Sequence, residues 1–202
     1  MKHTKNIRIA LLCSAVVGLL SPSESYAYLH IEAGVVTDKP TDTGTAASYG
    51  REGGIGLGLE YGTNWFTFVD YGVGALYFTR KYEVGTYNVS STWLEVPAVV
   101  RFWPIGMLGI GAGVYAAKAM GDLHESSNVT SDTFSSNPKF SDLHLSTLDV
   151  GYLFSVIYSP LPLLFIEGRY TASLFNASAD TNTFKYNDLS LLVGLRLGGK
   201  GF

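Results

Sequence analysis

The sequence predicts an all-β protein: an eight-stranded antiparallel up-and-down transmembrane β-barrel preceded by a signal peptide. Three observations carry this prediction. The N-terminus has the pattern of a secretory signal, apolar residues alternate with small or charged residues along short segments, and the connections between these segments go long and short in turn. In barrels of bacterial outer membranes, short turns lie on one side of the membrane and long loops lie on the other.

The first 27 residues have the three parts of a signal peptide. Basic residues at positions 2, 5 and 8 precede an apolar run over residues 9–20, and Ser25-Tyr26-Ala27 supplies small residues before a cleavage site. The apolar run is shorter than the roughly 20 residues that a helix needs to cross a bilayer. We therefore expect residues 1–27 to be a signal peptide that is cleaved after Ala27.

Residues 28–202 are expected to form a single barrel domain, because their number suits eight strands with loops. Without the signal peptide, the 14 basic and 17 acidic residues fall to 11 and 16, a net charge of about −5. This acidic balance argues against a nucleic-acid partner. Cys13, in the signal peptide, is the only cysteine, so the predicted mature chain has neither disulfides nor thiol chemistry.

The connections set the number of strands. The short connections are predicted at residues 62–64, 103–106 and 159–162. The long connections are predicted at residues 37–48, 80–92, 118–146 and 176–187. Seven connections join eight strands, so both ends of the barrel domain are expected on the side of the short turns, in the periplasm.

Alternation within each strand predicts which side chains face lipid. In the last strand, Leu189, Leu191, Val193, Leu195 and Leu197 share one face. Alternation alone is also compatible with a secreted soluble barrel that buries this face. The signal peptide, the scarcity of charge on the apolar face and the aromatic residues beside the short turns favour a membrane barrel. That aromatic girdle is predicted to comprise Tyr61, Trp65, Trp103 and Tyr158.

Charged residues occupy the opposite, inward phase and are predicted to form a charge network in the lumen. They are His30, Glu32, Glu60, Asp70, Glu95, Arg101, Asp149, Glu167, Arg169 and Arg196. Side chains fill the interior of an eight-stranded barrel, so we expect ion pairs, with Arg101 beside Glu95 and Arg169 beside Glu167. The surplus of acids leaves open a narrow cation-selective or proton-conducting lumen. The spacing of His and acidic residues predicts no metal site, and no cofactor is expected.

Four segments resemble, in order, the strand motifs of the small outer-membrane β-barrel proteins of Gram-negative bacteria (porin-family, OmpA-transmembrane-like). They are Leu94-Glu95-Val96-Pro97 running on to Arg101-Phe102, Leu108–Tyr115, Leu148-Asp149-Val150-Gly151, and Glu167-Gly168-Arg169-Tyr170. The resemblance implies an outer-membrane location, contact with outer-membrane lipid and lipopolysaccharide, and assembly by the barrel-assembly machinery. Phe202 is similar to the aromatic residue by which that machinery recognises the last strand.

The resemblance leaves the activity open, because this architecture hosts anchors, adhesins, channels and lipid-modifying enzymes. We expect a structural or surface-interaction protein without enzymatic activity, whose polar loops, residues 119–145 above all, contact a surface ligand. The first alternative is the narrow cation channel. The second is a lipid A-modifying hydrolase, because His144-Leu145-Ser146 is similar to the His-x-Ser pair of lipid A deacylases.

Overall fold

The structure is a computed structural model. It describes residues 26–42, 49–66, 68–84, 87–127, 135–141, 145–177 and 184–198. Most of the predicted signal peptide, residues 1–25, lies outside the described residues, as do His144 and Phe202. No helix in the described ranges is long and apolar enough to cross a membrane.

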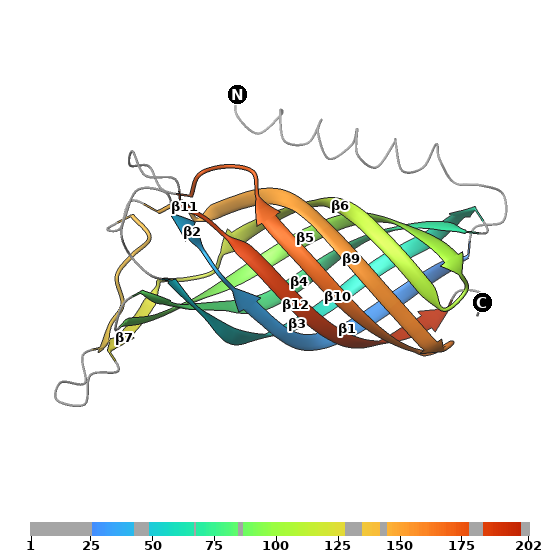
Figure 1. Cartoon of the computed structure of the whole chain (residues 1–202), viewed down its shortest axis with the longest axis horizontal. Coiled ribbons are helices and arrows are strands. Elements are labelled where there is room, and N and C mark those ends of the chain that lie inside the picture. The colour runs from blue at the N-terminus through green and yellow to red at the C-terminus, as the bar shows by residue number, and fades with distance from the viewer. Residues whose placement is uncertain are drawn as a thin grey trace, which may run out of the picture.

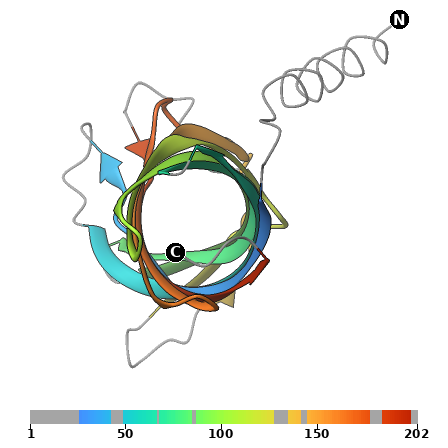
Figure 2. The ribbon, with the colours of Figure 1, turned by 90° about the vertical axis from the view of Figure 1, so that its right-hand side faces the viewer.

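Eight long strands form a closed antiparallel ring, which Figure 2 shows along the barrel axis. In order around the ring they are β1 (Ala27–Asp38), β3 (Tyr49–Phe66), β4 (Val69–Val84), β5 (Tyr87–Ile105), β6 (Leu108–Ala119), β9 (Leu148–Leu161), β10 (Leu164–Ser173) and β12 (Asn187–Gly198). Each strand pairs with the next, and β12 closes the ring onto β1 through pairs such as Leu29 with Leu197. The predicted eight-stranded antiparallel barrel is confirmed.

Four short strands lie at the end of the barrel where β1 stops and β12 begins (Figure 1). β2 (Thr41–Asp42) pairs with β11 (Phe184–Lys185), while β7 (His124–Ser127) pairs with β5 and with β8 (Ser135–Ser136). We call this end the loop end and the opposite end, where β1 begins and β12 stops, the turn end. The connections predicted to be short lie at the turn end, and those predicted to be long lie at the loop end.

The strands run further than the sequence indicated. All three short turns come a few residues later than predicted. The β3–β4 turn follows Phe66, the β5–β6 turn lies at Gly106–Met107, and the β9–β10 turn lies at Pro162–Leu163. The predicted long loop over residues 80–92 is wrong, because β4 continues to Val84 and β5 begins at Tyr87. Outward residues in this hairpin are polar, so it lacks the apolar alternation by which the other strands were found.

An exposed apolar belt surrounds the barrel. The outward residues of β12, Leu189 to Leu197, are 45–59% exposed, and those of β3, Ile55 to Tyr61, are 53–73% exposed. The belt continues through Val73 in β4, Ile110 in β6 and Phe154 in β9. A monomeric soluble protein rarely exposes so much contiguous apolar surface. A belt of this kind around a closed barrel is the surface that faces lipid.

Side chains fill the interior in layers. The outer core, at the loop end, includes Phe78, Trp93 and Leu153 from the barrel wall. Residues from the connections complete it, among them Leu123, Phe140, Ala177 and Phe184. A smaller apolar cluster at the turn end comprises Trp103, Ile157 and Phe165. Charged residues contact both clusters, since Arg80 lies against Trp93 of the outer core and Asp70 accepts a hydrogen bond from Trp103 at the turn end.

Gly151 makes one inward position in β9 sensitive to any side chain. A Cβ atom there would overlap the carbonyl oxygen of Ala172 and the ring of Tyr115. We expect Gly151→Ala to lower the free energy of unfolding by about 1–3 kcal/mol, the usual range for overpacking. Gly168→Ala in β10 is the matched control, since nothing lies within 4 Å of its Cβ position. Urea unfolding of both variants in lipid vesicles measures the difference, and equal midpoints would contradict the prediction.

Candidate functional site: a charged lumen

The ten residues predicted for the lumen network are all buried inside the barrel. Their exposed fractions range from 0 to 5%. They come from seven strands: His30 and Glu32 (β1), Glu60 (β3), Asp70 (β4), Glu95 and Arg101 (β5), Asp149 (β9), Glu167 and Arg169 (β10), and Arg196 (β12). Strand alternation places them there, because each lies in the phase opposite to the apolar belt.

Arg101 lies among carboxylates from three other strands. Its Nη2 donates to Glu60 Oε2 at 2.7 Å and to Glu167 Oε2 at 3.4 Å. Its Nη1 lies 3.9 Å from Asp70 Oδ1 and donates to the hydroxyl of Tyr28 at 3.4 Å. Nη1 also donates to Glu60 Oε1, so Arg101 and Glu60 make two parallel hydrogen bonds. In this arrangement a guanidinium binds a carboxylate most strongly.

Arg169 extends this network towards the loop end. Its Nε donates to Glu167 Oε1 at 3.1 Å, so Glu167 is shared between Arg169 and Arg101. Its Nη2 lies 3.5 Å from Glu32 Oε1, and its Nη1 lies 3.9 Å from Glu95 Oε1. The network therefore connects the barrel wall across the lumen, from β1 and β3 to β5 and β10.

One predicted pair is present and the other is wrong. Glu167 and Arg169 are neighbours on one face of β10 and contact each other. Glu95 and Arg101 are six residues apart along β5, about 20 Å at 3.3 Å per residue, so their side chains do not meet. Glu95 instead lies nearest to Arg169, which reaches it from another strand.

Arg80 is the centre of a second ion-pair cluster, which the sequence reasoning missed. Its Nη2 donates to Asp149 Oδ2 and to Asp188 Oδ2, both at 2.8 Å. Asp149 also accepts hydrogen bonds from the hydroxyls of Tyr115 at 3.0 Å and Ser173 at 2.7 Å. Strand alternation could have predicted this position, because Arg80 follows Leu76 and Phe78 at every second residue and therefore lies on the inward face of β4.

Aromatic rings cover Arg80 at the loop end. The guanidinium carbon lies 4.4 Å from the centroid of the Trp93 ring, 4.3 Å from that of Tyr186 and 5.4 Å from that of Phe78. Phe140 packs edge-on against Trp93 at 5.8 Å between centroids. Cation–π contacts of this kind are strongest where water is excluded. The outer core therefore packs over the Arg80 cluster at the loop end.

Trp103 lies inside the barrel at the turn end and is not part of the girdle as predicted. It is 1% exposed, and its indole Nε1 donates to Asp70 Oδ2 at 2.7 Å. The short connection predicted at residues 103–106 begins with Trp103, but β5 continues to Ile105, which keeps Trp103 in phase with Arg101 and inward. The other three girdle residues are on the outer surface: Tyr61 is 61% exposed, Trp65 38% and Tyr158 44%.

Buried carboxylates outnumber buried arginines among the described residues. The carboxylates are Glu32, Asp38, Glu60, Asp70, Glu95, Asp149, Glu167 and Asp188, and the arginines are Arg80, Arg101, Arg169 and Arg196. No group of three or more His, Cys, Asp or Glu side chains in the described part of the chain is arranged to hold a metal ion.

Ser146, the proposed nucleophile of the hydrolase alternative, is engaged in a local turn. Its hydroxyl donates to the carbonyl of Leu148 at 2.8 Å and accepts from the Leu148 amide at 3.1 Å. Its predicted partner His144 lies outside the described residues. A catalytic serine must present its hydroxyl to a base, and the described contacts of Ser146 are those of a residue that stabilises a turn.

Comparison with known proteins identifies the fold. No family model and no curated protein matches the sequence. The attachment invasion locus protein Ail of Yersinia pestis, solved in complex with the heparin analogue sucrose octasulfate, superimposes with a TM-score of 0.54 at 14% identity, covering 85% of this chain and 99% of Ail. A second structure of Ail gives a TM-score of 0.50 at 16% identity over the same shares of the two chains. The chain therefore has the fold of the small eight-stranded outer-membrane β-barrel proteins of Gram-negative bacteria.

Proposed function

We propose that this protein is an integral outer-membrane barrel with a sealed lumen, whose role is structural or surface-interacting and not enzymatic. In this proposal the turn end faces the periplasm and the loop end faces outward. The observation that carries it is the filled interior: ion-pair clusters around Arg101, Arg169 and Arg80 occupy the lumen, and the outer core covers them. In this proposal the ion-pair clusters and the outer core leave no continuous path for water through the lumen, and the barrel serves to present its outer end.

The loop end supplies a folded surface for interaction. The β4–β5 hairpin continues past the apolar belt, and β7 joins its edge by pairing residues 124–127 with residues 87–90. The inner face of the β4–β5 hairpin, with Tyr82, Val89 and Trp93, packs into the outer core. Its outer face carries polar residues such as Lys81 and Asn88. An ordered polar surface held by an apolar core supports recognition better than mobile loops would.

Lysines just above the belt support contact with lipopolysaccharide. Lys118 is the next outward residue of β6 after Val114 and Ala116, and it is exposed. Lys81 in β4 occupies a similar outward position beyond Tyr77, and Lys39 directly follows β1. Lipopolysaccharide carries phosphates in the outer leaflet, and cations placed at that level attract them. We infer that these lysines help to fix the height of the barrel in the membrane.

Single-channel recording separates the sealed barrel from the alternative of a narrow cation channel. We expect the refolded barrel, residues 28–202, to give no discrete conductance steps in a planar bilayer. Glu95→Gln should be equally silent, because the outer core and the Arg101 network remain in place. An open porin in the same bilayer serves as a positive control, and protease protection shows that the barrel has inserted. Cation-selective steps that change in Glu95→Gln would contradict the proposal and favour the channel.

A further inference from the structure

The three short turns of the turn end are apolar and carry no charged residue. The sequence has no Asp, Glu, Lys, Arg or His in residues 61–69, 102–117 and 150–166, which include these turns. Several of their apolar side chains are exposed: Phe68 58%, Ile105 60%, Met107 50%, Leu161 59% and Leu163 61%. At the loop end, by contrast, lysines such as Lys81 and Lys118 follow the belt directly. The two ends of the barrel are therefore built for different surroundings.

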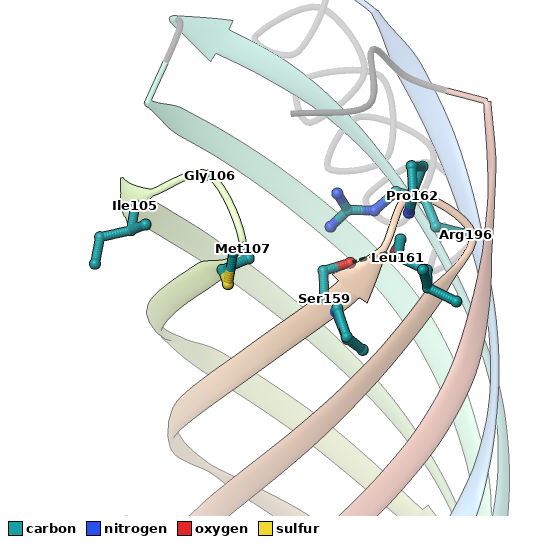
Figure 3. A pocket seen from close by; sticks show the side chains of 8 residues that line it. Ile105, Gly106, Met107, Ser159, Leu161, Pro162 and Arg196 are labelled. Atoms are coloured by element: carbon teal, nitrogen blue, oxygen red, sulfur yellow. Dashed lines mark hydrogen bonds between the residues drawn. The ribbon is translucent and has the colours of Figure 1, made fainter.

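Two of the turns lie side by side around a pocket of about 280 Å³ (Figure 3). The β5–β6 turn supplies Ile105 and Met107, and the β9–β10 turn supplies Leu161. Arg196 also lines the pocket, but it is only 4% exposed and its Nε donates to His30 inside the barrel at 2.9 Å. The exposed side chains that form the walls of the pocket are therefore apolar.

Backbone hydrogen bonds hold the β9–β10 turn against its neighbours. The amide of Ser159 donates to the carbonyl of Met107 at 2.8 Å, which joins the two turns around the pocket. The amide of Arg196 donates to the carbonyl of Leu163 at 2.9 Å, which ties the tip of the turn to β12. Polar groups of the backbone can lie in a bilayer only where the protein itself satisfies them. These bonds meet that requirement at the outermost part of the barrel.

The side chains of the β9–β10 turn serve the same purpose. The hydroxyl of Ser159 donates to the carbonyl oxygens of Leu161 at 3.3 Å, drawn in Figure 3, and of Leu164 at 3.1 Å. Pro160 and Pro162 have no amide hydrogen that needs an acceptor. The turn is thus apolar in its exposed side chains and has its polar groups paired within the protein.

The apolar turns continue the belt past the aromatic girdle. Leu148 pairs with Lys118, and from this level to the girdle residue Tyr158 β9 rises about 25 Å along the barrel axis, at 3.3 Å per residue and a strand tilt of about 40°. This is the full height of the apolar band of an outer-membrane barrel. Leu161 lies roughly 8 Å further along the axis, at the level of the lipid headgroups. A surface for a protein partner would carry a polar rim, whereas this one is continuous with the lipid-facing belt.

We propose that the turn end is embedded in the periplasmic leaflet, so that the β5–β6 and β9–β10 turns contact lipid instead of water. Phospholipid acyl chains cover Ile105, Met107, Leu161 and Leu163 and fill the pocket between the two turns. The bilayer thickens locally to reach them, which is a common response to a long apolar surface. This inference rests on the proposed function in one respect, the insertion of the barrel with its turn end towards the periplasm, and not on the filled lumen.

Spin-label accessibility tests the proposal on the refolded barrel in vesicles of phosphatidylethanolamine and phosphatidylglycerol. Residues 28–202 contain no cysteine, so a nitroxide can be attached at a single introduced cysteine. Molecular oxygen concentrates in hydrocarbon and a neutral nickel chelate in water, so the ratio of their collision rates with the label reports its surroundings. The test positions are Met107→Cys and Leu161→Cys. Both side chains are exposed, so the changes remove no core packing.

Two further labels provide the scale. Val193→Cys lies in the belt, and Asp122→Cys lies exposed at the loop end. We expect the oxygen-to-nickel ratio at Met107→Cys and Leu161→Cys to be several-fold above that at Asp122→Cys and to approach that at Val193→Cys.

The same labels separate failure of this inference from failure of the proposed function. Ratios at Met107→Cys and Leu161→Cys equal to that at Asp122→Cys, with Val193→Cys still in hydrocarbon, would overturn the inference alone. The turns would then lie in the periplasm with their apolar surface open to a protein partner. A water-like ratio at Val193→Cys as well would overturn both the inference and the proposed membrane barrel.

Discussion

Replacing Arg101 with methionine should lower the free energy of unfolding by about 3–5 kcal/mol, the usual cost of removing one partner of a buried ion pair. The guanidinium is fully buried and contacts Glu60, Glu167 and Asp70. Without it, these carboxylates remain inside the barrel with little to offset their charge, and Glu60 loses its two-pronged partner. Urea unfolding of the refolded barrel in vesicles, followed by tryptophan fluorescence, measures the change.

The double variant Arg101→Met with Glu60→Gln distinguishes lost charge balance from lost packing. Glutamine keeps the shape of Glu60 and removes its charge, so this pair should recover much of the loss, because replacing both charged partners is often close to neutral. Lys118→Met on the neighbouring strand β6 is the surface control and should stay within about 0.5 kcal/mol of the wild type. An Arg101→Met midpoint equal to that of Lys118→Met would show that the lumen network does not stabilise the barrel.

Strand alternation explains how much of the fold could be predicted. Where an apolar outward face meets lipid, as in β12, side chains alternate without interruption, and the direction of each residue follows from its position. This apolar–polar alternation is lost where a strand extends beyond the membrane, because its outward face then meets water and no longer carries apolar side chains. The outward residues of the β4–β5 hairpin, such as Lys81 and Glu83, are polar, so residues 80–92 were predicted to be a loop. In the structure the two strands are paired up to Val84 and Tyr87.

The same limit explains what was missed in the lumen. Phase places a residue inside the barrel but does not say which residues meet there, since contacts across the lumen depend on strand tilt and on the stagger between strands. Arg169 accordingly contacts Glu95 of a distant strand, which no local pattern indicates. Arg80 falls in the segment predicted as a long loop, and Trp103 falls in the short connection predicted at residues 103–106, whereas β4 and β5 include both residues. Both errors came from misjudged strand ends.

Replacing Val193 with arginine should destabilise the inserted barrel by about 2–4 kcal/mol, the cost of a cation on the lipid-facing surface near the bilayer midplane. Val193 is the middle of the five outward apolar residues of β12 and lies opposite Ala33 of β1 and Ile166 of β10. Its side chain is 48% exposed, so arginine meets no steric conflict within the protein, and the cost arises from hydrocarbon. Asn187→Arg, outward on the same strand but at the loop end, should cost about 0–1 kcal/mol.

Urea unfolding in vesicles compares the two variants, Val193→Arg and Asn187→Arg. If Val193→Arg inserted and unfolded like Asn187→Arg, the apolar belt would not be the surface that contacts lipid, and the proposed insertion of the barrel in the membrane would lose its basis.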